Sequence, residues 1–409
     1  MSSEAHRLSK PASSNFKVTL SRRASDRLRA GHVWAYRSDV TASADIPAGA
    51  LVTVQDERGR ALGSALYSGA SEISVRMLSP EIIGDDETLI ALVRERVRKA
   101  LAYRGRVVEG DSDAYRLIFS EADELPGLIV DRYSQVLSLQ ALTQAMDRAE
   151  IKSAVVAELL ESLKGVGVNS VVERIDPRIR QLEQLPSIPP GLLAGEESAS
   201  IYKLNGIRFH FDGFAGQKTG AFLDQRENYA AASHYAHGRG LDAFCYQGGF
   251  ALHLASQCSS ITAVDSSRPA LEVAEQNEAL NPGHPAIEWI EANAFDLLRD
   301  YAAQGEQYDT IILDPPAFAK SKRNLNTALR GYKELNLRAL KMLRPGGILV
   351  TCSCSYHVGD QDFLEMLASA GADAHRQTRL LEHRAQAKDH PMVLGIPETH
   401  YLKCFILGV

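Results

Sequence analysis

Residues 200–409 alternate short apolar segments with segments of helical spacing, and this rhythm constrains the fold more than any other feature of the chain. Strand signals occur at 239–245, 261–265, 287–291, 309–313, 347–353 and 401–407. Helices that join successive strands of one sheet make those strands run parallel. The pattern therefore predicts an open, mainly parallel, doubly wound α/β sheet, preceded by a hairpin that turns at Asn205-Gly206.

The N-terminal half has a different pattern. Residues 17–90 hold short apolar segments punctuated by Gly and Pro, which is typical of a small β-barrel. Residues 105–195 alternate strand and helix signals and end in a Pro- and Gly-rich stretch, QLPSIPPGLLAGEE, that is typical of a loop. A chain of 409 residues exceeds one ordinary core, so we expect three domains, at 16–90, 91–195 and 196–409.

With 45% hydrophobic and 23% charged residues, the chain has the composition of a folded soluble protein. Its first segment is polar and no apolar run approaches the length that spans a bilayer, so we expect a cytoplasmic protein with no membrane partner. The five cysteines are too few and too scattered for a disulfide framework. Cys352 and Cys354 lack the second ligand cluster of a zinc site, so no metal is expected.

The net charge of −6 conceals two basic segments. Residues 1–37 hold eight Lys and Arg against two Asp and Glu, and residues 320–344 hold eight Lys and Arg against one Glu. Phosphate binding depends on such local basic faces rather than on the total charge. Two solvated helix faces would give the same counts, so charge alone leaves nucleic-acid binding undecided.

Ligands of doubly wound sheets bind beyond the carboxyl ends of the strands, which makes the residues at those ends informative. Gly248 and Gly249 follow the first strand and allow a tight turn into a helix. Asp265 ends the second strand, where a carboxylate can accept the hydroxyls of a ribose in a nicotinamide cofactor or in another nucleoside. An Asp-Pro-Pro element begins at Asp314 after the fourth strand, and hydride transfer has no evident use for it.

Four motifs, GQKTGAFLDQREN, DAFCYQGGF, DPPAFAKS and TCSCS, resemble those of the bacterial PUA-domain-containing ribosomal RNA cytosine-C5 methyltransferases of the large (23S) subunit. GHVWAYRSDV is similar to the PUA signature of that family, and YRLIFSEADELPGLIVDRY is similar to its central domain. The resemblance covers nearly the whole chain. It implies an N-terminal PUA-like β-barrel, a central α+β domain and a C-terminal Rossmann-like class I methyltransferase domain with a mainly parallel seven-stranded sheet.

The resemblance also implies a cofactor, S-adenosyl-L-methionine, and residues that bind it: Lys218, Thr219, Phe222, Asp224, Arg226, Asp242, Phe244, Tyr246, Gly248, Asp265, Ser266, Asn293, Ala294 and Asp314. Two positions depart from the family pattern. Asn293 stands where the family has an Asp that accepts from the adenine amino group, a role that the amide oxygen of Asn can also fill. Gln184 replaces a Gly after an Arg-rich segment, which affects the turn there and not the chemistry.

Carbon methylation needs a nucleophile, because C5 of cytosine attacks a sulfonium methyl group only after a thiolate has added to C6. The Ser-Cys-Ser around Cys354 resembles the nucleophile motif of the family, and Cys352, on the same strand face, is the alternative. Asp314 can bind the ring edge and help to protonate N3. Ala317 stands where related enzymes carry a second cysteine for release, which leaves Lys320, a water or Cys352 to accept the C5 proton.

RNA contacts are expected from Arg37 in the barrel and from Lys320, Lys322 and Arg323 beside the Asp-Pro-Pro element, with Lys320 suited to a phosphate. Trp34 could stack on a base, although a core position is the commoner fate of such a residue. The resemblance implies large-subunit ribosomal RNA, naked or early in assembly, as the partner, and a homodimer is compatible with it. The target base must leave its stack to meet the cofactor.

Three other functions stay open at this point. A guanine N-methyltransferase would use the same scaffold, although Ala317 stands where such enzymes carry an aromatic residue. A non-catalytic ribosome-assembly RNA-binding protein would not need Asp265, Asp314 and Cys354. A small-molecule methyltransferase would leave the N-terminal half without a purpose.

Overall fold

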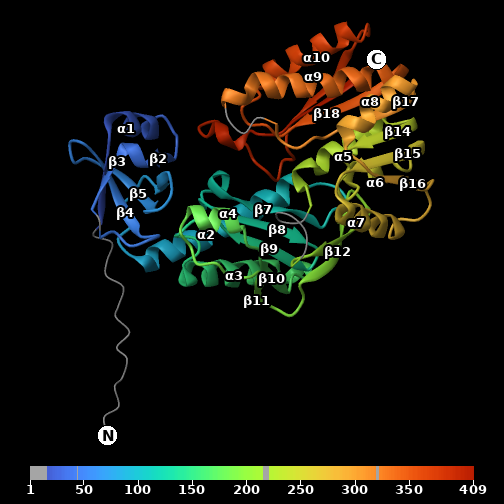
Figure 1. The fold of residues 1–409 in the computed structure, drawn as a ribbon. Coiled ribbons are helices and arrows are strands. Elements are labelled where there is room, and N and C mark those ends of the chain that lie inside the picture. Colours follow the sequence, from blue (N-terminus) through green and yellow to red (C-terminus); the bar gives the residue numbers. More distant parts are fainter. Residues whose placement is uncertain (1–15, 44, 215–220, 319–321) are drawn as a thin grey trace.

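A computed structural model describes residues 16–43, 45–214, 221–318 and 322–409, and the features below refer to these residues. Their strands form a six-stranded, a five-stranded, a two-stranded and a seven-stranded sheet. The six-stranded sheet lies at one end of the molecule, the seven-stranded sheet at the other, and the five-stranded sheet between them (Figure 1).

The N-terminal sheet is nearly a closed barrel. Its order is β2-β6-β5-β4-β1-β3, so that the two end strands are those joined directly in the chain through a short 3-10 turn. Alternating side chains such as Val18, Val54 and Val75 are fully buried inside it, which is the pattern of a sheet with one face on a core. The strands are β1 (Lys17–Leu20), β2 (Trp34–Tyr36), β3 (Val40–Ala42), β4 (Leu51–Asp56), β5 (Ala61–Tyr67) and β6 (Ile73–Ser79).

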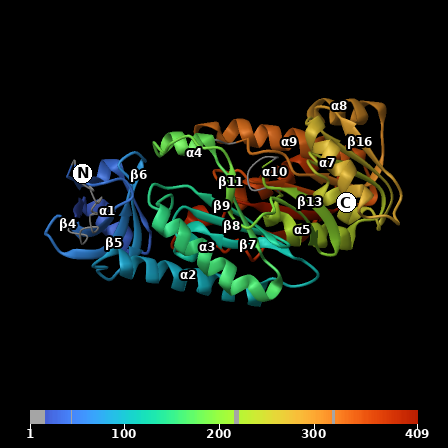
Figure 2. The same ribbon diagram turned by 90° about the horizontal axis from the view of Figure 1, so that it is seen from below.

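The middle sheet has the order β11-β10-β9-β8-β7, and two long helices, α2 (Asp86–Val107) and α3 (Ala149–Leu163), run side by side along one of its faces (Figure 2). The expected domain boundary at residue 90 falls inside α2. The expectation of a loop at the end of this region is wrong in part, because Gly191–Ala194 forms β11 and pairs with β10. The other strands are β7 (Ala114–Phe119), β8 (Leu128–Tyr133), β9 (Val136–Ala141) and β10 (Ser170–Glu173).

A hairpin, β12 (Ala199–Leu204) and β13 (Ile207–Asp212), leads into the C-terminal part. Asn205 and Gly206 both have positive φ, 50° and 86°, as the type I′ turn requires. The seven-stranded sheet follows in the order β16-β15-β14-β17-β18-β20-β19, with the last two strands antiparallel to their neighbours. Its strands are β14 (Gly238–Ala243), β15 (Cys258–Asp265), β16 (Ile287–Glu291), β17 (Tyr308–Leu313), β18 (Leu343–Ser353), β19 (Arg379–Arg384) and β20 (Lys403–Gly408).

Helices cover both faces of this sheet, which confirms the doubly wound arrangement. One face packs on α5 (Arg226–Tyr235), α6 (Gly249–Leu254) and α7 (Arg268–Ala279), and the other on α8 (Ala294–Gln304), α9 (Leu325–Met342) and α10 (Asp360–Asp373). Neighbouring side chains divide between the two cores: Val350 and Cys352 belong to the first, Leu349 to the second. None of the described helices is both long and apolar enough to cross a membrane.

Candidate functional site

The loop that leaves β14 has an unusual backbone. Phe244 and Tyr246 have φ of 70° and 50°, and Gly248 has φ of 85°. Left-handed non-glycine residues cost about 1–3 kcal/mol each and cluster at ligand sites. Asp265, at the end of β15, holds the loop: it accepts from the backbone N–H of Tyr246 at 2.9 Å and, with its other oxygen, from that of Ser267 at 2.9 Å. The carboxylate thus ties together the two loops at the centre of the carboxyl edge.

Asp242 is a buried carboxyl group that is only partly satisfied. Its Oδ2 accepts from the backbone N–H of Ala251 at 2.9 Å, while its Oδ1 is buried without a hydrogen-bond partner. Burial raises the pKa of Asp242 well above its usual value, and the charges of Asp314 and Asp265 add to the increase. An orphaned buried oxygen of this kind fits a cationic or N–H donor group of a ligand.

Asn293 caps the following helix. Its Oδ1 accepts from the backbone N–H groups of Phe295 at 2.9 Å and Asp296 at 3.4 Å, so Asn293 is the N-cap of α8, and Ala294 is the first residue of that helix. Because the cap engages the amide oxygen, the amide nitrogen is the group that points away from the helix end. The expected acceptor at this position is therefore already in use.

The predicted motif before α5 lies only partly within the described residues, which exclude Lys218 and Thr219. Phe222 is 37% exposed and meets Tyr246 edge-on, with ring centroids 5.1 Å apart. Asp224 accepts from the hydroxyl of Tyr401 at 2.7 Å. Arg226 is buried in an ion pair with Asp389 at 2.9 Å, which links α5 to the segment after β19.

Asp314 follows β17, and its Oδ2 accepts from Nε2 of Gln225 at 3.0 Å. The amide oxygen of Gln225 accepts in turn from Asn228 at 2.6 Å, and that of Asn228 accepts from Nε of Arg384 at 3.0 Å. These three side chains were not assigned a role from the sequence. Gln225 and Asn228 lie inside the quoted motif, but their neighbourhood with Asp314 depends on the fold.

Cys354 is half-buried just beyond the end of β18. Its two neighbours are fixed by Tyr332 of α9, whose hydroxyl lies 2.9 Å from both the Ser353 and the Ser355 hydroxyls. From β20, Nζ of Lys403 donates to the carbonyl oxygen of Ser355 at 2.7 Å. The turn that carries the thiol is therefore held from two sides.

Cys352 lies in a different environment. It is fully buried on the α5 side of the sheet and pairs in register with Cys404 of β20. Burial raises the pKa of the Cys352 thiol well above its usual value, and Cys404 and the charge of Asp314 contribute to the increase. A thiol of this kind is a poor nucleophile at neutral pH.

The expected RNA-binding residues are not all alike. Arg37 is exposed, but its guanidinium donates to the carbonyl oxygens of Gly69, Ala70 and Ser71 and so shapes a barrel loop. Arg323 is exposed before α9, and neither Lys320 nor the side chain of Lys322 is among the described parts of the chain. The barrel nevertheless approaches the carboxyl edge of the seven-stranded sheet, where the candidate site lies.

The approach is seen at His32 of the barrel, whose Nε2 lies 3.4 Å from a carboxylate oxygen of Glu398 in the C-terminal part. Tyr356, two residues beyond Cys354, is 44% exposed. Burial raises the pKa of Tyr356, as do the charges of Glu398 and of Tyr36 in the barrel strand β2. Trp34 of barrel strand β2 is half-buried and donates to Glu121, in the 3-10 turn that follows β7 of the middle domain, at 2.9 Å, so it joins two domains.

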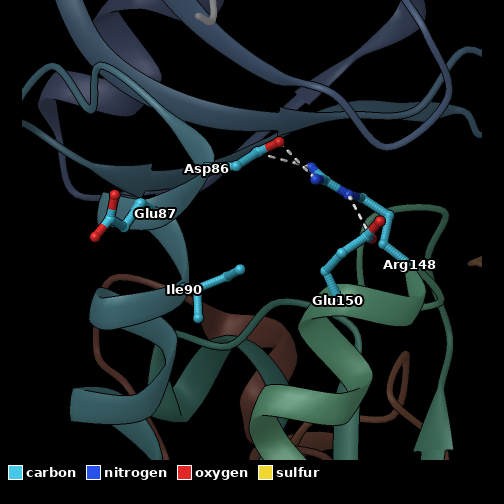
Figure 3. Close-up of a pocket in the computed structure, with 5 residues that line it drawn as sticks. All are labelled: Asp86, Glu87, Ile90, Arg148 and Glu150. Carbon is cyan, nitrogen blue, oxygen red and sulfur yellow. Dashed lines mark hydrogen bonds and ion pairs between the residues drawn. The ribbon is translucent and has the colours of Figure 1, made fainter. Parts of the chain in front are cut away.

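Two cavities lie away from this edge. One, of about 310 Å³, is lined by Asp86, Glu87, Ile90, Arg148 and Glu150 at the start of α2 and α3. Figure 3 shows that Arg148 spans it to reach Asp86, with nitrogen–oxygen distances of 3.1 and 2.7 Å. The other, of about 500 Å³, lies behind α5 and mixes acidic and basic side chains. Among the described residues, no three His, Cys, Asp or Glu side chains form a group that could hold a metal ion.

Comparison with known families adds to this geometry. Residues 18–80 match the model of a PUA-like domain, and residues 184–395 match that of an S-adenosylmethionine-dependent methyltransferase. Ribosomal RNA large subunit methyltransferase I of Photobacterium profundum is 38% identical over 390 residues, 92% of this chain and 95% of that protein. The protein of the same name from Yersinia pestis bv. Antiqua is 36% identical over 386 residues, again 92% and 95%.

Solved structures show the same fold. A chain assigned as a methyltransferase and complexed with SAH has a TM-score of 0.80 at 18% identity, and the match covers 96% of this chain and 100% of that one. A SAM-dependent methyltransferase assigned in Streptococcus mutans has a TM-score of 0.78 with the same identity and coverage.

Proposed function

Because this chain belongs to the ribosomal RNA large subunit methyltransferase I family, we propose that it methylates C5 of a cytosine in 23S ribosomal RNA through a covalent adduct with Cys354. S-adenosylmethionine supplies the electrophilic methyl group when bound. The observation that carries the proposal is the contrast between the two candidate thiols: Cys354 lies half-buried at the carboxyl edge, and Cys352 is sealed in the core.

The residues at the edge fit the cofactor. The orphaned Oδ1 of Asp242 suits the ammonium group of its methionine part, because only a charged donor compensates a buried carboxylate well. Asp265 suits the ribose hydroxyls, since a carboxylate that accepts one backbone N–H on each oxygen retains further lone pairs. Gly249, the first residue of α6, lies so close to Tyr229 that an added Cβ would be 2.5 Å from the Tyr229 hydroxyl, so no larger residue fits at this end of the helix.

The reaction divides among the protein groups as follows. The Cys354 thiolate adds to C6 of the flipped cytosine, which turns C5 into an enamine-like carbon that takes the methyl group. Asp314 binds the ring edge and assists protonation of N3 as the C6–S bond forms. Lys320 or a water then accepts the C5 proton, the Cys354 sulfur leaves as a thiolate, and N3 returns its proton to Asp314 as the aromatic ring is restored.

The ring that follows the Asp-Pro-Pro element supports carbon rather than nitrogen chemistry. Phe318 packs on Tyr332 with ring centroids 4.5 Å apart, and its backbone N–H donates to the Ser355 hydroxyl at 3.0 Å. It contributes to the core beside α9. A ring used in this way is less available to stack on an extruded guanine.

The proposal is tested by Cys354→Ala beside Cys352→Ala. We expect Cys354→Ala to abolish formation of 5-methylcytidine in ribosomal RNA, measured by nucleoside mass spectrometry, and to abolish the protein–RNA adduct trapped by RNA that contains 5-fluorocytidine. Cys352→Ala should retain both. Persistent 5-methylcytidine with Cys354→Ala would exclude this nucleophile, and a methylated guanine in its place would favour the nitrogen chemistry.

RNA binding completes the proposal. We expect the barrel, through the face that carries Tyr36, and the basic segment around Arg323 to hold the RNA on either side of the Cys354 turn. Charge reversal, Arg323→Glu, should raise the KM for RNA several-fold, with the kcat and the affinity for S-adenosylmethionine unchanged. Equal KM values for RNA in wild type and Arg323→Glu, measured at low salt, would contradict this role.

A further inference from the structure

A chain of three side chains connects the edge strand β19 with the carboxylate of Asp314. Nε of Arg384 donates to Oδ1 of Asn228 at 3.0 Å, and Nδ2 of Asn228 donates to Oε1 of Gln225 at 2.6 Å. Nε2 of Gln225 then donates to Oδ2 of Asp314 at 3.0 Å. The chain crosses from β19 through α5 to the end of β17.

Chemistry at the two ends fixes the direction of every hydrogen bond in this chain. A guanidinium only donates, so the oxygen of the Asn228 amide must face Arg384 and its nitrogen must face Gln225. The same reasoning turns the nitrogen of Gln225 toward Asp314. Oδ2 of Asp314 is therefore held as an acceptor, and a proton on this carboxyl group is directed to Oδ1.

The middle of the chain is sealed from solvent. Gln225 is 2% exposed and Asn228 is 1% exposed, so water cannot take over the donor that faces Asp314. The Asn228 nitrogen makes a second bond, to the carbonyl oxygen of Ala385 at 3.1 Å, which further prevents rotation of that amide. Both amides are in this way fixed before any substrate binds.

We propose that Gln225 is a positioning residue for methyl transfer: oriented by Asn228 and Arg384, it presents Oδ1 of Asp314 to the substrate base. This inference rests on the proposed function, in which Asp314 meets the edge of the cytosine ring. Gln225 itself touches neither the reacting carbon nor the thiol of Cys354 in the proposed reaction. Its effect passes through Asp314.

Other ionisable groups also face Asp314. They are Asp242 from β14, Tyr229 from α5 and Cys352 from β18, and the negative charge of Asp314 raises the pKa of all three. None of these three groups carries a positive charge at neutral pH, whereas the Gln225 amide donates to the carboxylate and stabilises its charged form. Removing that donor should raise the pKa of Asp314.

Two variants test the chain. Gln225→Met keeps the volume and removes the donor, and we expect kcat to fall at least tenfold, with the KM for RNA within twofold of wild type. The limb of the kcat–pH profile that Asp314 controls should move to higher pH by about one unit. Asn228→Asp changes a side chain that does not contact Asp314, but the new carboxylate cannot donate to Gln225. The Gln225 amide should therefore turn its nitrogen toward residue 228 and its oxygen toward Asp314, and the same shift of the kcat–pH profile should appear.

Controls separate this role from stability and from the proposed function. Gln144→Met removes a buried amide from the middle domain and should leave the kcat–pH profile unchanged. Binding of S-adenosylmethionine, measured by calorimetry, reports the folded fraction, and Asn228→Asp carries the test if Gln225→Met does not fold.

A wild-type pH profile in the folded variants overturns the inference, even where thermal stability falls. Shifted profiles with reduced kcat in both variants support it. Cys354→Ala decides the proposed function independently, since an inactive Cys354→Ala together with unshifted profiles leaves the nucleophile in place and removes only the role of Gln225.

Discussion

At the scale of single residues, Lys403 is a buried charged side chain that lowers the stability of the native state and lies beside the turn that carries Cys354. It is 3% exposed, and burial lowers its pKa to about 8 from 10.5, although the charges of Asp360 and Cys354 oppose the decrease. Between pH 8 and 10.5 the unfolded chain holds a proton that the native chain has released, so native stability should rise with pH there, by about 3 kcal/mol in total. Lys403→Met should remove this rise in urea unfolding experiments and should stabilise the protein at pH 7. If the free energy of unfolding of the variant still rises by the same amount between pH 8 and 10.5, Lys403 is not the source of the rise.

The position of a site residue in the sheet decides whether the sequence can predict it. Asp265 and Asp314 end strands of a parallel sheet, so periodicity alone places them at the ligand edge. Lys403 and Arg384 lie on the two antiparallel strands at the sheet edge, where no rule relates sequence position to the site. The engaged oxygen of Asn293 was not predictable either, because the cap depends on where α8 begins.

At the scale of elements, His253 joins α6 to the hairpin β12–β13. Its ring nitrogens lie 2.7 Å from the carbonyl oxygen of Gly249 and 3.1 Å from that of Leu204. Burial lowers its pKa to about 4 from 6.5, against the effect of the two carbonyls. The unfolded chain therefore binds a proton first as the pH falls, and the stability of the native state should decrease between pH 6.5 and 4 by about 3 kcal/mol. His253→Gln, which does not titrate, should reduce this decrease in denaturant unfolding; an identical decrease would assign it to other groups.

Elements with strong periodicity were predictable, and elements defined by partners were not. β16 has the expected bounds of 287–291, and β17 begins one residue before the strand expected at 309–313. The sequence predicts a loop at β11, because Gly191 and the prolines before it outweigh three apolar residues, and only the β10 ladder makes it a strand. α1 (Arg22–Arg29) was missed because it is short, rich in arginine and buries only two residues.

At the scale of the whole molecule, the barrel shares a hydrophobic cluster with the middle domain, which includes Leu51, Leu66 and Leu78 of the barrel, and polar contacts join it to both other parts. Trp34 donates to Glu121 of the middle domain, and His32 lies 3.4 Å from Glu398 of the methyltransferase domain. Gly395 approaches the barrel so closely that an added Cβ would lie 2.8 Å from the carbonyl oxygen of Gly31. Contacts of this kind connect domains that were identified from the sequence one at a time, and no local pattern predicts them.

Glu183 also contacts the barrel, and its substitution tests how the barrel is held. It is 3% exposed, and its carboxylate accepts from the Ser68 hydroxyl at 2.8 Å and from Arg76 at 3.3 Å, both in or beside the barrel. Glu183→Gln removes the nearer of the two carboxylates beside the Arg76 guanidinium and leaves that of Glu121, 3.8 Å from its Nε, so we expect a loss of about 2 kcal/mol in the free energy of unfolding. The exposed Glu81→Gln should be neutral. Because the barrel is proposed to hold RNA, the KM for RNA should rise in Glu183→Gln while calorimetry with S-adenosylmethionine stays unchanged; parallel losses of both would mean that Glu183 supports the whole fold instead.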